Sequence, residues 1–76
     1  MDKRLFQDLP IDLKADYTYA KGEFIGQRQY GFLKFAIYKC PHFYVEIMMD
    51  KEIQVIKDII LGNEGYLRKL VKNKFK

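Results

Sequence analysis

The sequence has 76 residues, of which 49% are hydrophobic and 32% are charged, and its net charge is +4 at pH 7. This length predicts one domain over residues 1–76 with a thin core, and the composition excludes a disordered chain. No apolar run approaches the roughly 20 residues that span a bilayer, and no signal peptide is evident. We therefore expect a cytoplasmic protein without a membrane span.

The side chains that most enzymes and metal sites use are scarce. Ser and Trp are absent, and Thr18, Cys40 and His42 are the only aliphatic hydroxyl, thiol and imidazole. Serine-based acyl transfer is thereby excluded, and two Cys or His ligands are too few for a structural zinc site. The glycines match no phosphate-binding loop. We expect a non-enzymatic protein without a cofactor, a metal or a small-molecule substrate.

Two enzymatic alternatives compete with this expectation. Cys40-Pro41-His42 offers a thiol and an imidazole, but Pro41 favours a turn and no third residue is identifiable to orient His42. The carboxylates of Asp8, Asp12 and Asp16 offer acid–base chemistry, but outward charges on a solvated strand explain them equally well. The pattern favours a hairpin turn with a buried thiol in the first case and a wet strand face in the second.

The first half of the chain is predicted to form strands. Leu5, Phe6 and Leu9 are spaced like a short helical turn, and apolar residues then alternate with polar ones over residues 9–20. That period of two predicts a strand with one buried face, and Pro10 places it at a sheet edge. A turn at residues 20–23 and a short strand at residues 24–29 follow.

The centre of the chain predicts an antiparallel hairpin. Residues 32–39 and 43–49 are rich in aromatic and β-branched residues and are separated by the turn at Cys40-Pro41. The odd-numbered residues of both strands are predicted to face the core. The large outward residues are then either covered by the predicted helices and part of the core, or exposed as a surface that suits a partner. Its members are Phe32, Lys34, Tyr38, Tyr44, Glu46 and Met48.

The part of the chain that follows the hairpin is predicted to be helical. Asp50 suits an N-cap, the apolar residues between Ile53 and Ile60 lie on one helical face, and Gly62 suits a stop. Residues 63–76 predict a second amphipathic helix. The predicted fold is α+β: a three- or four-stranded antiparallel sheet followed by two short C-terminal helices packed on one face.

The basic charge is concentrated at the C-terminus. Residues 1–64 contain nine Lys or Arg and ten Asp or Glu, whereas residues 65–76 contain five basic residues and no acid. Those five residues are Arg68, Lys69, Lys72, Lys74 and Lys76.

The sequence thus supports two hypotheses about function. The first is a small interaction protein, of an accessory, regulatory or inhibitor type, that binds another protein or a second copy of itself through the aromatic sheet face. The alternative is a nucleic-acid-binding protein that grips phosphates with the basic C-terminal segment. A basic face that only solubilises the protein, or that meets an anionic membrane, explains the same charges.

Overall fold

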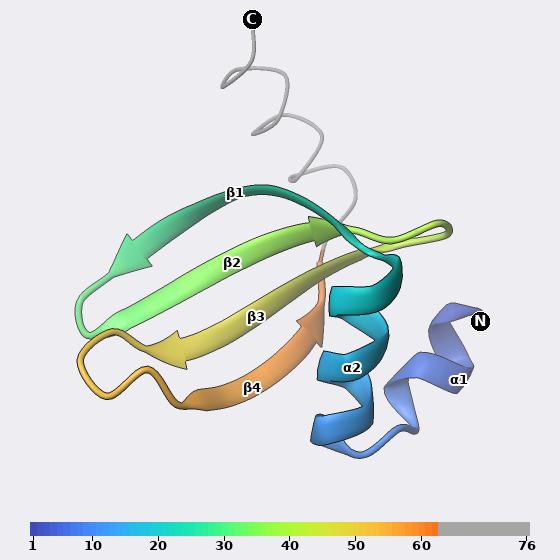
Figure 1. The fold of residues 1–76 in the computed structure, drawn as a ribbon, viewed down its shortest axis with the longest axis horizontal. Helices are drawn as coiled ribbons and strands as arrows, with labels where there is room; N and C mark the ends of the chain where they lie inside the picture. The colour runs from blue at the N-terminus through green and yellow to red at the C-terminus, as the bar shows by residue number, and fades with distance from the viewer. Residues whose placement is uncertain (63–76) are drawn as a thin grey trace, which may run out of the picture.

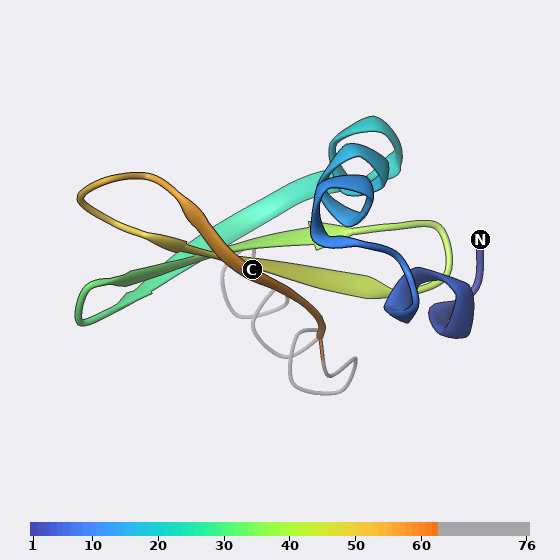
Figure 2. The same cartoon turned by 90° about the horizontal axis from the view of Figure 1, so that it is seen from below.

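The computed structural model describes residues 1–62, which form two helices followed by a four-stranded antiparallel sheet. The elements are α1 (Lys3–Gln7), α2 (Ile11–Lys21), β1 (Glu23–Tyr30), β2 (Leu33–Lys39), β3 (Tyr44–Asp50) and β4 (Ile56–Leu61). The strands lie in the order β1-β2-β3-β4. Both helices lie at the end of the sheet that carries the turn between β2 and β3 (Figure 1). From the side, α2 lies over one face of the sheet (Figure 2).

The structure confirms an α+β protein with an antiparallel sheet but contradicts the predicted order of its elements. Residues 9–20, which were predicted to be a strand, contain most of α2. Residues 50–61, which were predicted to be a helix, contain a turn and β4. The helices therefore precede the sheet rather than follow it. The second predicted C-terminal helix, over residues 63–76, lies outside the described residues.

The two buried residues of α2 are three positions apart, which is the spacing of one helical face and explains why residues 11–21 form a helix. The fixed φ of Pro10, −60°, suits entry into a helix, and Asp12 in the first turn complements the helix dipole. Ala15 and Thr18 are the buried residues of α2, whereas Leu13, which belongs to the alternating pattern, is exposed. The alternation in the sequence is therefore not a division between a core face and a wet face.

Asp50 begins a turn rather than a helix. Its Oδ1 accepts hydrogen bonds from the backbone N–H groups of Glu52 at 2.8 Å and Ile53 at 3.0 Å. Both an N-cap and an isolated Asp-initiated turn use bonds of this kind, so the sequence signal fits either structure. Gln54 then adopts a left-handed φ of 56°, which ends the turn before the β-branched residues of β4.

A two-residue turn sets the register of the central hairpin. The backbone N–H of Cys40 donates to the carbonyl oxygen of Phe43 at 2.8 Å, which leaves Pro41 and His42 as the turn residues. Residues of opposite parity consequently pair across β2 and β3, as Ala36 does with Ile47. The prediction that odd-numbered residues of both strands share the core face is therefore wrong.

The main core lies between the helices and the sheet face that they cover. Its buried members are Phe6, Ala15, Ala36, Cys40, Phe43, Val45, Ile47 and Ile59. The ring of Phe6 packs against that of Phe43, with 5.0 Å between the centroids. Where α2 ends, a Cβ at Gly22 would lie 2.5 Å from the carbonyl oxygen of Thr18 and 3.2 Å from the Cβ of Tyr38. Glycine therefore allows the end of α2 to approach the sheet.

We expect Ile47→Ala to destabilise the protein by about 2–5 kcal/mol, because it removes a fully buried side chain and leaves a cavity. The matched control is Ile53→Ala at a position that is 65% exposed, where the change should stay below about 0.5 kcal/mol. Urea denaturation followed by circular dichroism measures both. Equal losses at the two positions would contradict this description of the core.

Candidate interaction surfaces

The six residues predicted to form one outward surface are divided between the two faces of the sheet and a turn. Lys34 and Tyr38 lie on the helix-facing side of β2. The rings of Tyr19 and Phe24 pack edge-on against Tyr38, at 5.7 and 5.5 Å between centroids, and burial raises the pKa of Tyr38. Phe32 lies in the turn between β1 and β2 and is 71% exposed. Because even-numbered residues of β2 pair with odd-numbered residues of β3, the even-numbered residues of the two strands lie on opposite faces of the sheet.

Tyr44, Glu46 and Met48 lie on the opposite face of β3, which we call the far face. Tyr44 is only 9% exposed and Glu46 only 6% exposed. Tyr44 belongs to a second buried cluster with Ile37, separate from the main core. Tyr44 and Glu46 therefore offer little surface to a partner, and the predicted aromatic face is not a continuous contact area.

A salt bridge crosses the far face from β1 to β3. Arg28 donates to Glu46 Oε1 from Nη2 at 3.0 Å and from Nε at 3.4 Å. On the way the guanidinium lies over the ring of Phe35 in β2, with its Cζ 4.5 Å from the centroid. The pair compensates a buried carboxylate, since an unpaired charge at that position would be costly. Sequence reasoning missed Arg28 because its partner is two strands away.

The β1–β2 and β3–β4 turns lie at the end of the sheet away from the helices (Figure 1). A second group of large apolar side chains in and beside these turns is exposed. We call this group the sheet tip: Tyr30, Phe32, Ile53 and Val55, with 77%, 71%, 65% and 52% of their surfaces exposed. It spans the β1–β2 and β3–β4 turns, which are joined by a 2.8 Å hydrogen bond from the Lys51 N–H to the Phe32 carbonyl. The twist of the sheet spreads the two turns apart (Figure 2).

Asp50 holds the β3–β4 half of the sheet tip in place. The hydrogen bond from the Ile53 N–H and the one from the Glu52 N–H lower the pKa of the Asp50 carboxyl, with a smaller contribution from the charge of Lys57. The ionised carboxylate is thus the form that fixes this turn. Since Ile53 is both a hydrogen-bond donor to Asp50 and a member of the sheet tip, the charge of Asp50 positions an exposed apolar side chain.

The two enzymatic alternatives gain no supporting geometry. Burial raises the pKa of the Cys40 thiol, which disfavours the reactive thiolate, and His42 is exposed in the turn. Asp8, Asp12 and Asp16 are all exposed. Among residues 1–62, no three His, Cys, Asp or Glu side chains gather where they could hold a metal ion. The same part of the chain contains no helix with the length and apolar character needed to cross a membrane.

The residues of the nucleic-acid alternative, Arg68, Lys69, Lys72, Lys74 and Lys76, lie outside the described residues. Comparison with protein-family models, curated proteins and solved structures gives no match. The assignment of function therefore depends on the surfaces of the molecule itself.

We expect the amide proton shifts of Glu52 and Ile53 to titrate with a midpoint below 3.8, the ordinary pKa of an Asp side chain. A lowered folded-state pKa means that the stabilisation is present above the unfolded-state pKa and is lost as the pH falls through the folded value. NMR spectra recorded between neutral and acidic pH measure this midpoint. In Asp50→Asn the amide can still accept hydrogen bonds but carries no charge, so this titration should disappear. Its persistence would assign it to another group.

We expect a double-mutant cycle between Arg28→Met and Glu46→Gln to show a coupling energy of about 1–2 kcal/mol. This lies between the values for exposed and buried pairs, because Glu46 is buried while the Arg28 side chain is 39% exposed. Chemical denaturation of the four proteins measures the coupling. The exposed carboxylate Glu52, changed to Gln, is the control and should alter the stability little. A coupling near zero would show that the pair adds nothing to the fold.

Proposed function

We propose that this chain is a small protein-interaction module that contacts its partner through the sheet tip. The observation that carries the proposal is the exposure of four large apolar side chains in or beside the β1–β2 and β3–β4 turns, at the end of the sheet that the helices leave uncovered. Large aromatic and aliphatic side chains exposed at one end of a molecule are typical of partner contacts. Phe32 is the one member of the originally predicted surface that belongs to the sheet tip.

The charges around the sheet tip favour a protein partner over a nucleic acid. Asp50 begins the β3–β4 turn, and Lys51 and Glu52 follow it as neighbours. A surface that binds a phosphate backbone is typically rich in positive charges and poor in negative ones. Protein interfaces commonly have apolar anchor residues surrounded by polar residues of both charges. The tip has the second character.

A photo-crosslinking experiment tests this proposal. A benzophenone amino acid replaces Phe32 in one variant and Leu5 in another, because Leu5 is a 57% exposed apolar residue on α1, away from the sheet tip. We expect the Phe32 probe to give discrete protein adducts in cells that express the chain and the Leu5 probe to give none. Mass spectrometry identifies each adduct as a different protein or as a second copy of this chain.

Once a partner is identified, we expect Phe32→Ala and Ile53→Ala each to weaken binding by about 2 kcal/mol, roughly 30-fold in affinity, as truncation of an interface anchor does. Calorimetric titration measures the affinity, and Leu5→Ala is the control that should leave it unchanged. Equal crosslinking at both ends of the molecule, or adducts that a nuclease removes, would contradict the proposal. The second result would favour the nucleic-acid alternative.

A further inference from the structure

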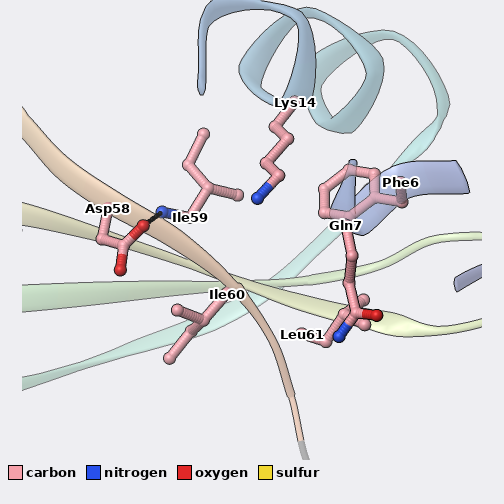
Figure 3. A pocket seen from close by; sticks show the side chains of 7 residues that line it. All are labelled: Phe6, Gln7, Lys14, Asp58, Ile59, Ile60 and Leu61. Carbon is pink, nitrogen blue, oxygen red and sulfur yellow. Dashed lines mark hydrogen bonds between the residues drawn. The ribbon is translucent and has the colours of Figure 1, made fainter. Parts of the chain in front are cut away.

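A groove of about 440 Å³ runs between the helices and the outer edge of β4 (Figure 3). Phe6 and Gln7 of α1 and Lys14 of α2 line one side, and residues 58–61 of β4 line the other. Within the described residues β4 pairs only with β3, so its second edge faces this groove. The groove therefore combines an unpaired strand edge with the polar side chains of Gln7 and Lys14, at the end of the molecule that carries the helices.

The backbone polarity of this edge follows from the pairing on the other side. The Gly62 N–H donates to the Tyr44 carbonyl at 2.8 Å, which fixes the Gly62 backbone toward β3. Because hydrogen-bonded positions alternate along an antiparallel strand, the backbone groups of Leu61 and Ile59 point the opposite way, into the groove. The N–H group of Ile59 already has a partner, since it donates to Asp58 Oδ1 at 2.8 Å. Leu61 thus presents both a donor and an acceptor, and Ile59 presents an acceptor.

Lys14 gives the groove its chemical preference. The half-buried side chain extends from α2 so that its Nζ lies between Ile59 and Phe6 in the groove, 5.9 Å from the centroid of the Phe6 ring (Figure 3). No carboxylate among residues 1–62 forms an ion pair with it. Asp58 also lines the groove and carries a negative charge, and its Oδ1 accepts the hydrogen bond from the Ile59 N–H at the strand edge. An entering carboxylate would therefore find its counter-charge at Lys14.

We propose that this groove binds an extended acidic peptide segment of a partner protein, which adds to β4 as a fifth strand and pairs a carboxylate with Lys14. Addition of a strand to a free sheet edge draws its affinity from the backbone and its specificity from alternate side chains. Here the alternate side chains of the segment would lie beside the half-buried Leu61 and Lys14. A second copy of this chain fits less well, because a β4–β4 pair would have to release the Asp58 bond on both strands.

The test uses the full-length chain and a synthetic probe, a blocked peptide of about six residues that alternates valine and threonine around one glutamate. The matched control peptide carries glutamine instead. We expect saturable NMR shift changes at the amides of Ile59, Ile60 and Leu61, with the glutamate peptide binding roughly two- to fivefold more tightly, as for a partly solvated ion pair. Lys14→Gln should abolish this preference, and Lys21→Gln, on the exposed end of the same helix, should preserve it.

A second variant tests the strand edge independently of Lys14. Asp58→Ala releases the Ile59 N–H and should tighten the binding of both peptides while the protein remains a monomer by sedimentation. Shift changes confined to β1, equal affinity for the two peptides, or a doubled mass without peptide binding would each overturn the proposal. Phe32→Asp at the sheet tip should leave peptide binding intact, so failure of this site and failure of the proposed function are distinguishable.

Discussion

The turn at Pro41 and His42 is the constraint on which the arrangement of the sheet depends. Because it contains two residues, it places unlike parities opposite each other across β2 and β3, and so it selects Ala36 and Ile47 for the core beneath the helices. One residue more or fewer would exchange the faces of one strand. The pairing of Arg28 with Glu46 across the far face depends on this same register.

Small side chains allow α2 to pack closely against the face of the sheet that this register buries. Ala15 and Thr18 are the buried residues of α2, and the Thr18 hydroxyl donates to the Lys14 carbonyl oxygen at 2.7 Å, so its polar group is satisfied inside the helix. Gly22 admits the close approach of the chain as it passes from α2 to β1. A short chain can bury little surface, and close packing of small residues makes good use of what it has.

The sequence predicted those elements whose local and tertiary preferences agree. The runs of aromatic and β-branched residues around Cys40-Pro41 specified two strands, and the spacing of Leu5, Phe6 and Leu9 specified the short α1. The helix α2 was missed because its buried stripe, made of Ala15 and Thr18, carries almost no hydrophobic signal. Its exposed apolar residues imitated a strand instead. The exposure of turn residues such as Phe32 depends on where the helices lie, which no local pattern records.

The burial of Cys40 has a practical meaning for the whole molecule. It is the chain's single thiol, and its side chain lies in the main core, 1% exposed. A thiol reagent reaches Cys40 only when the helices and the sheet separate. The rate at which the thiol is modified therefore reports how often the native fold opens. For the same reason, two folded copies cannot become linked by a disulfide bond. Oxidative damage at this position would mark molecules in which this part of the core has opened.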